Sequence, residues 1–180
     1  RYWDLAATSA KPGKDPDWTV GTLLGRATDG RFFVLDVQRV RATPAGVERL
    51  ISQTATLDRA RLGYVSIRME QEPGSSGIAT LDRYSRMVLA GYDIRGVRTS
   101  GSKEERARPL SAQAEAGNVK LLNGLWNHEF LNELCAFPSR EVHDDQVDSA
   151  SGALAVLCAE TEFRAAHGGN PGVSQRPSFR

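Results

Sequence analysis

The chain has 180 residues, of which 40% are hydrophobic and 25% charged, and its formal net charge is +1 at pH 7. This length and composition are typical of one ordinary globular domain. The balanced charge excludes a strongly basic chain, so composition gives no sign of nucleic-acid binding. No apolar run reaches the length of a transmembrane helix and no signal peptide opens the chain, which predicts an intracellular protein with no membrane partner.

The first part of the chain predicts an antiparallel meander of three strands. Asp29-Gly30 is typical of a tight hairpin between the second and third strands. The three strands are expected over residues 2–6, 18–27 and 32–40. Thr43-Pro44-Ala45-Gly46 then opens a helix. Its apolar positions recur at helical spacing, which predicts a core side made of Val47, Leu50, Ile51 and Leu57.

The rest of the chain alternates between strands and helices. Strands are expected over residues 63–69 and 92–97, and the pattern of Val119 to Leu122 allows a short edge strand. Helices are expected over residues 78–90, 102–116, 127–136 and 144–166. A meander followed by this alternation predicts an α/β fold with a mixed sheet covered by helices. We expect one domain over residues 1–166 and a flexible, polar tail over 167–180.

Three groups of acidic residues beside apolar segments indicate a function. Asp4 lies in the first strand, Glu70 ends the fourth, and Asp144, Asp145 and Asp148 open the last helix. An unpaired charge beside a core is costly, and several carboxylates that converge on one point repel each other unless a cation lies between them. Mg²⁺ or Mn²⁺ is the usual cation for a site made only of carboxylates. The sequence therefore predicts a metal-dependent enzyme.

The last acidic group has a geometry that suits such a site. At about 100° per residue, Asp145 and Asp148 lie about 60° apart around the helix, and Asp144 and Asp148 about 40° apart. Acids at a helix start also complement the helix dipole, so this group alone has a structural explanation. The opposite side of the helix is expected to be the core stripe of Val147, Ala150, Leu154 and Leu157.

Two neighbouring residues leave alternatives open. Glu72 competes with Glu70, because residues two apart on a strand face the same way, although Glu70 directly ends the apolar run. His143 is a metal ligand, a proton donor to a leaving oxygen, or a partner of a neighbouring carboxylate.

Several short segments carry a resemblance to a known family. They are Tyr2-Trp3-Asp4-Leu5-Ala6, Asp17-Trp18-Thr19, residues 70–77, residues 103–107, residues 115–119 and residues 143–149. In these segments the chain resembles the nuclease domain of the large terminase subunit of tailed bacteriophages, a member of the ribonuclease H-like (retroviral-integrase-like) superfamily. The resemblance covers Tyr2 to about Cys158. It implies a mixed five-stranded sheet flanked by helices, with the first strand between the meander and the parallel strands.

The resemblance also implies an activity, which is the two-metal endonucleolytic cleavage of concatemeric double-stranded phage DNA during genome packaging. Two Mg²⁺ or Mn²⁺ ions, about 4 Å apart, are the expected cofactors. In the family pattern Asp4 bridges both metals, Glu70 supports one, and the Asp145/Asp148 end of the last helix supports the other. These four residues are the expected catalytic set, with Asp144 as a further metal ligand.

The same resemblance implies partners and a location. An N-terminal ATPase domain, the portal and the small terminase subunit are the expected partners, in the cytoplasm of the infected bacterial host. The sequence contains no Gly-x-x-x-x-Gly-Lys-[Ser/Thr] run, so we expect no ATPase activity from this chain. Contacts to the DNA backbone that do not read sequence are expected from Lys103, Arg106, Arg108, Lys120 and Arg140.

Two other functions fit the same residues. Another ribonuclease H-like enzyme, such as a junction resolvase or a transposase core, shares the metal chemistry and differs in substrate. Alternatively, the chain is a non-catalytic DNA-binding or assembly module of the packaging motor whose acids only cap helices and pair with arginines.

Overall fold

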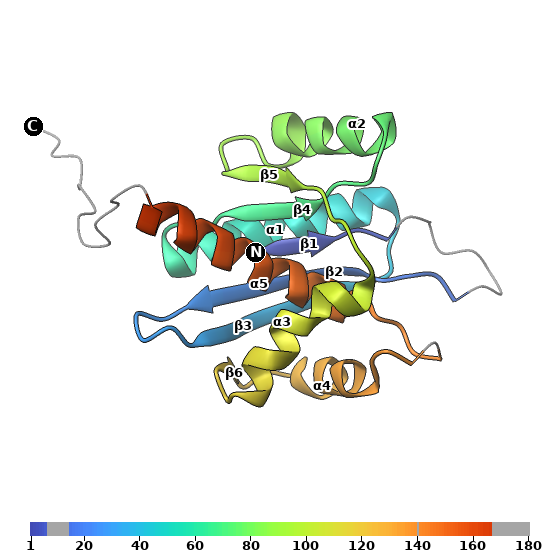
Figure 1. The fold of residues 1–180 in the computed structure, drawn as a ribbon. Helices are drawn as coiled ribbons and strands as arrows, with labels where there is room; N and C mark the ends of the chain where they lie inside the picture. The colour runs from blue at the N-terminus through green and yellow to red at the C-terminus, as the bar shows by residue number, and fades with distance from the viewer. Residues whose placement is uncertain (7–14, 140, 167–180) are drawn as a thin grey trace, which may run out of the picture.

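The structure is a computed structural model, and it describes residues 1–6, 15–139 and 141–166 (Figure 1). At its centre is a six-stranded mixed sheet with the strand order β5-β4-β1-β2-β3-β6. The strands are β1 (Tyr2–Asp4), β2 (Thr19–Arg26), β3 (Phe32–Val40), β4 (Ile67–Glu70), β5 (Ile94–Val97) and β6 (Val119–Leu121). The helices are α1 (Pro44–Leu62), α2 (Ser75–Arg83), the π-helix η1 (Tyr84–Val88), α3 (Lys103–Glu115), α4 (Asn127–Ala136) and α5 (Asp145–Ala166). The predicted tail over 167–180 lies outside the described residues.

The strand order confirms the main topological expectation. β1 pairs antiparallel with β2 and parallel with β4, so it lies between the meander and the parallel strands. The count of five strands implied by the resemblance is one too few. The sixth is Val119–Leu121, where the sequence pattern allowed a short edge strand, and it lies at the edge of the sheet, parallel to residues 32–34 of β3. Its pairing starts where the Phe32 amide donates to the Asn118 carbonyl at 2.8 Å, and the sequence pattern did not reveal which strand it pairs with.

The first helix begins where its sequence signals indicate, but it runs on to Gly63, where a strand was expected to start, and its core side differs in one place. The Thr43 side chain accepts a hydrogen bond from the Gly46 amide, and Pro44 occupies the first turn. Gly63 ends the helix with φ +77°, a conformation that favours glycine. Ile51 is buried, whereas Leu57 is 62% exposed, so its predicted place in the core is wrong.

The helix expected over residues 78–90 also differs from the prediction. It starts earlier, at Ser75, and its second half from Tyr84 to Val88 is a π-helix. The wider turn places Tyr84 and Leu89 in the core beside α1.

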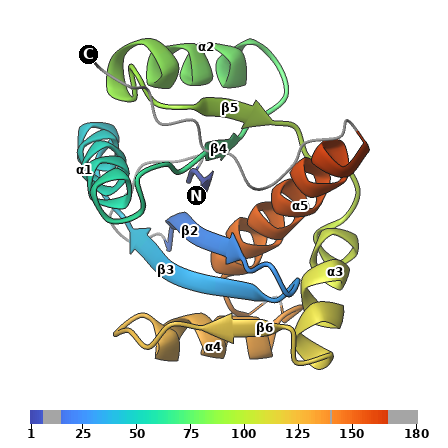
Figure 2. The ribbon, with the colours of Figure 1, turned by 90° about the vertical axis from the view of Figure 1, so that its left-hand side faces the viewer.

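Two hydrophobic clusters cover the opposite faces of the sheet. One contains Tyr2 and packs beneath α3, α4 and α5, and the other contains Trp3 and packs beneath α1 and η1. Figure 2 shows α1 on one side of the strands and α3 and α5 on the other. Tyr2 and Trp3 are neighbours in β1, where successive side chains point to opposite faces. Within the described residues, no helix combines the length and apolar character needed to cross a membrane.

The start of the chain and the last helix meet at the amino end of β1. The buried Arg1 guanidinium pairs there with Asp58 at 2.6 Å and with Asp36 at 2.7 Å. Arg68 on the neighbouring strand pairs with Glu160 of α5 at 2.6 Å. Arg1 and Glu160 line one hollow, which lies at the end of β1 opposite Asp4.

Candidate active site

The pairing of β1 with β4 explains why two distant carboxylates lie together. Trp3 is level with Met69 in this parallel pair, and each strand ends on the following residue, Asp4 and Glu70. Neighbouring strands lie about 4.8 Å apart, so residues at one level are in reach of each other. The sheet therefore brings the first two acidic groups of the sequence to the carboxyl ends of adjacent strands.

Helix α5 brings the third group to the same place, because its second turn is fixed to the sheet. The Ser149 hydroxyl donates to the Tyr2 carbonyl at 3.0 Å and accepts from the Thr22 amide at 3.1 Å. Gly152 lies directly on the Tyr2 ring, where an added Cβ would come within 2.4 Å of a ring carbon. This close approach places Asp148, one residue before Ser149, over the end of β1.

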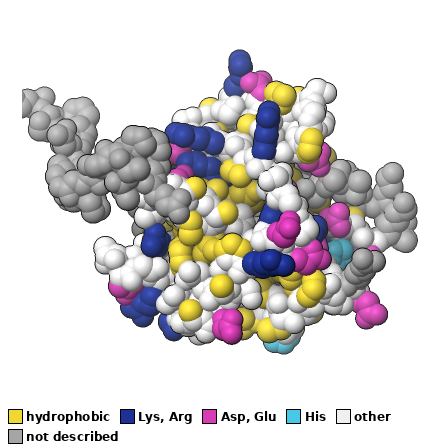
Figure 3. Space-filling model, viewed as in Figure 1, with side chains coloured by type: hydrophobic (Ala, Val, Ile, Leu, Met, Phe, Trp, Pro, Cys, Tyr) yellow, Lys and Arg dark blue, Asp and Glu magenta, His cyan; other side chains and the backbone are white. Residues whose placement is uncertain are grey.

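The three groups open into a cleft of about 490 Å³ at the carboxyl ends of β1 and β4. Acidic and basic side chains lie together on the right of the face shown in Figure 3. The charged residues that line the cleft are Asp4, Asp17, Glu70, Glu72, Lys103, Arg106, Asp145 and Asp148. All four residues of the predicted catalytic set are thus among its walls.

Asp4 shows the electrostatic consequence of this arrangement. Burial raises the pKa of Asp4 to about 8, and the negative charges of Glu70, Asp148 and Asp145 add to the effect. Without a cation beside it, Asp4 therefore holds a proton at neutral pH. A divalent cation among these carboxylates removes the repulsion and replaces that proton.

Asp145 is held in the cleft wall by the start of β2. The Trp18 amide donates to its Oδ2 at 3.0 Å. Burial raises the pKa of Asp145, the Trp18 amide lowers it, and the nearby charge of Asp17 raises it again.

Two cations from α3 neutralise part of the acidic group. Lys103 Nζ lies 2.5 Å from Asp144 and 2.9 Å from Asp148, and Arg106 lies 2.6 Å from Asp148. Arg106 also comes within 3.9 Å of Glu70. Burial lowers the pKa of Lys103, but its hydrogen bonds to Asp144 and Asp148 outweigh this and raise the pKa above its ordinary value. Lys103 and Arg106, both predicted from sequence as DNA contacts, therefore face the acids directly.

Two of the other predicted DNA contacts, Lys120 and Arg108, do not line this cleft. Lys120 in β6 is level with Phe33, whereas Asp4 is level with Arg39 through Val20 of β2. Six residues of strand separate these two levels, a length of about 20 Å. Lys120 is therefore not brought to the acids, since pairing with the far end of β3 places it at the other end of the sheet.

Arg108 and Arg140 have different outcomes. Arg108 is exposed on α3. It lies about 200° around the helix from Arg106 and so points away from the acids. Arg140 lies outside the described residues.

The structure also separates the alternatives within the acidic groups. Glu70 and Glu72 both line the cleft, but only Glu70 is among the charges that raise the pKa of Asp4. Asp144 lies beside the cleft and pairs with Lys103. His143 Nδ1 lies 3.5 Å from Asp145 Oδ2 and its Nε2 lies 2.7 Å from Asp15, so in this structure it is a partner of neighbouring carboxylates.

Two residues that sequence reasoning did not select belong to the site. Asp17, His143 and Asp145 place one potential ligand atom each within 4.8 Å of one another. Asp17 stands in the Asp17-Trp18-Thr19 segment that carried the family resemblance, which was the signal available for it. Thr99 donates its hydroxyl to Glu70 at 2.7 Å, and the sequence around Thr99 gives no sign of this contact.

The donor set of the cleft fits a hard divalent cation. Its ligands are carboxylate oxygens from β1, β4 and α5, with one imidazole beside them, and Mg²⁺ and Mn²⁺ both prefer such oxygen-rich sites. The acids outnumber the two cations of α3, so charge remains for a metal to neutralise.

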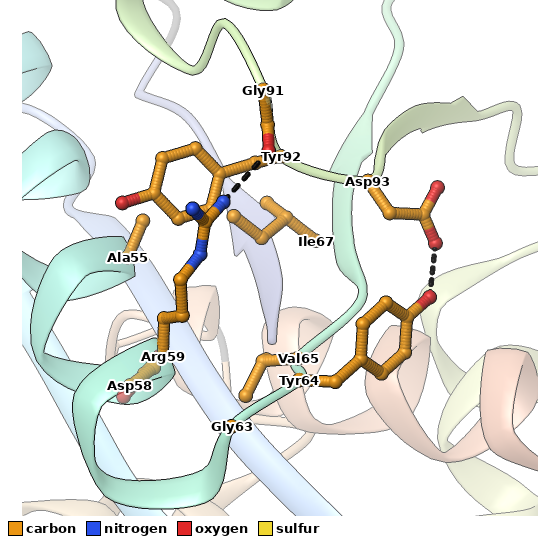
Figure 4. Close-up of a pocket in the computed structure, with 10 residues that line it drawn as sticks. All are labelled: Ala55, Asp58, Arg59, Gly63, Tyr64, Val65, Ile67, Gly91, Tyr92 and Asp93. Carbon is orange, nitrogen blue, oxygen red and sulfur yellow. Dashed lines mark hydrogen bonds between the residues drawn. The ribbon is translucent and has the colours of Figure 1, made fainter. Parts of the chain in front are cut away.

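A second hollow, at the amino ends of β4 and β5, has a different character. Figure 4 shows the Arg59 guanidinium over the Tyr92 ring, 3.7 Å from its centroid, and donating to the Gly91 carbonyl at 2.7 Å. On the other side the Tyr64 hydroxyl donates to Asp93 at 2.6 Å. These groups are paired with one another, and none of the predicted site residues that the structure describes lines this hollow.

Comparison with known proteins agrees with the fold and with the cleft. The family model of the terminase RNaseH-like domain matches residues 1–157. A search of curated proteins gives no match. The family match confirms the resemblance found in the sequence, and it covers every element from β1 to most of α5. The chain therefore belongs to the family of terminase RNaseH-like domains.

Proposed function

We propose that this domain is a Mg²⁺- or Mn²⁺-dependent endonuclease that cuts concatemeric double-stranded DNA during phage genome packaging. Family membership supports a nuclease role in packaging in general terms. The observation that carries the finer proposal is the convergence of Asp4, Glu70, Asp145 and Asp148 on one cleft. Burial and the negative charges of Glu70, Asp148 and Asp145 together raise the pKa of Asp4 to about 8, and a bound cation would relieve the repulsion among these carboxylates.

The proposed roles follow from position. Asp4, between Glu70 and the α5 acids, would bind both metals, and Glu70, oriented by Thr99, would help to hold one of them. Asp145 and Asp148 would hold the other, with Asp17 and His143 within reach of Asp145. When bound, the two ions would activate a water for in-line attack and stabilise the leaving 3′ oxygen.

The cations of α3 are proposed to meet the DNA at the cleft. Lys103 and Arg106 face the acids, so a phosphate that enters the cleft lies within reach of both. Phosphate contacts of this kind position DNA without reading its sequence. In the full-length protein we further propose an N-terminal ATPase domain, the portal and the small terminase subunit as partners, in the cytoplasm of the infected host, with no ATPase activity in this domain.

Plasmid nicking tests the proposal directly. Purified chain with Mn²⁺ is expected to relax supercoiled DNA and to stop when the metal is chelated. Asp4→Asn is expected to lower the nicking rate at least about 100-fold, because it removes a carboxylate that would bind the metal directly. Asp82→Asn, an exposed acid paired with Arg86, is the matched control and is expected to cut at the parent rate. Parent-like cutting by Asp4→Asn would end the proposal.

One observation favours the non-catalytic alternative. Asp148 already has two protein cations, Lys103 and Arg106, as partners. If this pairing were its whole purpose, the chain would bind DNA equally well with and without divalent metal and would never cut it. A gel-shift series with and without Mn²⁺, run beside the nicking assay, separates the two functions. Comparing branched with linear duplex substrates separates a packaging nuclease from a junction resolvase.

A further inference from the structure

Glu133 of α4 is a buried acid whose two side-chain hydrogen bonds both go to the start of α5. It is 3% exposed, although it stands in a helix at the surface of the fold. One of its carboxylate oxygens accepts a hydrogen bond from the Gln146 backbone N–H at 2.5 Å, and the other accepts one from the Gln146 side-chain NH₂ at 2.6 Å. Gln146 is itself 1% exposed and directly follows Asp145. The first turn of α5 is thus held by an acceptor from another helix.

A second route from Glu133 reaches Asp145 itself. Arg39 lies 3.6 Å from the Glu133 carboxylate, and its guanidinium stacks on the Trp18 indole, 4.1 Å from the ring centroid. Arg41 stacks at the same distance from Trp18, so the indole is held between two guanidinium groups. The Trp18 amide then donates to Asp145.

From these contacts we infer that Glu133 is a positioning residue for Asp145 in the proposed metal site. The inference rests on the proposed function. The first amides of a helix have no partner within the helix, so its first turn moves unless another group accepts from them. A carboxylate also interacts favourably with the positive end of the helix dipole. Glu133 supplies both effects at the residue next to Asp145, and it braces Trp18, the donor on the other side.

The neighbouring acid Glu129 provides a matched comparison. It is one turn earlier on α4 and lies 3.5 Å from Arg39, but its side chain is 65% exposed. Only its main-chain carbonyl meets Gln146, accepting a hydrogen bond from the Gln146 side chain at 3.4 Å, whereas Glu133 accepts through its carboxylate. If Mn²⁺ binding depends only on the negative charge beside Arg39, substitution of either glutamate weakens it. If it depends on the hydrogen bonds to Gln146, only substitution of Glu133 weakens it.

The test uses Mn²⁺ binding by isothermal titration calorimetry on the whole chain. Glu133→Gln is expected to weaken Mn²⁺ binding about 10- to 100-fold, the usual loss when a group that orients a ligand is removed. The Gln146 NH₂ also donates to the Glu129 carbonyl, which keeps it turned toward residue 133, so it meets the NH₂ of the new glutamine and one of the two hydrogen bonds is lost. The double substitution Glu133→Gln with Gln146→Glu reverses donor and acceptor and is expected to restore binding to within about threefold. Glu129→Gln is expected to bind Mn²⁺ as the parent does.

Thermal unfolding of each variant separates positioning from stability. If Glu133→Gln lowers the melting temperature while Mn²⁺ affinity stays at the parent value, or if the reversed pair restores stability without affinity, the inference is wrong. A parent chain that takes up no Mn²⁺ overturns it as well. A parent that binds Mn²⁺ and cuts no DNA contradicts the proposed function only, since the affinities of the variants still answer the question about Glu133.

Discussion

At the scale of single residues, Asp4 lowers the stability of the metal-free chain. In the folded chain it keeps its proton up to about pH 8, whereas in an unfolded chain an aspartate loses its proton near pH 4. Between these values the folded state binds more protons, so the free energy of unfolding falls as the pH rises. A substitution that replaces the Asp4 carboxyl group with an uncharged group is therefore expected to stabilise the folded, metal-free chain.

Asp4→Asn is expected to raise the free energy of unfolding of the metal-free chain by about 2 kcal/mol at pH 8 and to have little effect at pH 4. This is less than the whole pKa difference implies, because solvent screens the charge of a side chain that is not fully buried. Urea denaturation in a chelator at both pH values measures it. Asp29→Asn is the control, since its Arg31 partner lowers the pKa of Asp29 and removal of that acid brings no gain at pH 8. A destabilised Asp4→Asn at pH 8 would contradict this account of the cleft.

The residues of the cleft differ in how far sequence reveals them. Asp4, Glu70, Asp145 and Asp148 are visible because each charge abuts an apolar segment. Thr99 and Glu133 are not visible, because their importance lies in contacts to Glu70 and Gln146 that only the fold creates. Lys103 and Arg106 were expected at the DNA, and their pairing with the acids of α5 depends on the packing of two helices that no spacing encodes.

At the scale of elements, the contact between α5 and β1 sets the geometry of the cleft. The helix approaches the sheet closely because Gly152 leaves room for the Tyr2 ring.

Gly152→Ala is expected to destabilise the fold by about 1–3 kcal/mol, because a methyl group there overlaps a buried ring and the helix must move. Chemical denaturation measures this. Helix propensity alone predicts the opposite sign, a gain of about 1 kcal/mol for alanine over glycine. Ala155→Gly, at an exposed position of the same helix, reports that propensity in the absence of a steric effect. A more stable Gly152→Ala would show that the contact is looser than described.

Helices and strands were predicted correctly where neighbouring residues determine them, and less well where contacts with distant segments determine them. The hairpin at Asp29-Gly30 and the start of α1 at Thr43 follow from turn and capping chemistry. The sixth strand depends on a distant partner in β3, and the exposure of Leu57 depends on which side of α1 meets the sheet. The π-helix at Tyr84 has no sequence signature of its own and arises from core packing on η1.

At the scale of the whole molecule, β1 joins the two hydrophobic clusters. Tyr2 belongs to one and Trp3 to the other, so neither cluster can separate from the sheet without exposing the same strand. We therefore expect the two faces to unfold together, as small single domains usually do.

Ile51→Ala in one cluster and Leu154→Ala in the other are each expected to lower the free energy of unfolding by about 2–5 kcal/mol. Both side chains are fully buried. In each variant, tryptophan fluorescence and far-ultraviolet circular dichroism are expected to report one transition with the same midpoint. Two separated midpoints in either variant would show that the clusters are independent folding units.

The hollow lined by Arg1 and Glu160 determines where a label can be attached to this protein. Arg1 and Glu160 lie at the end of the sheet opposite the carboxylates of the cleft, near the last turns of α5. A fluorescent reporter fused to the amino terminus is therefore expected to lie at the end of β1 opposite Asp4 and to leave the acidic cleft uncovered.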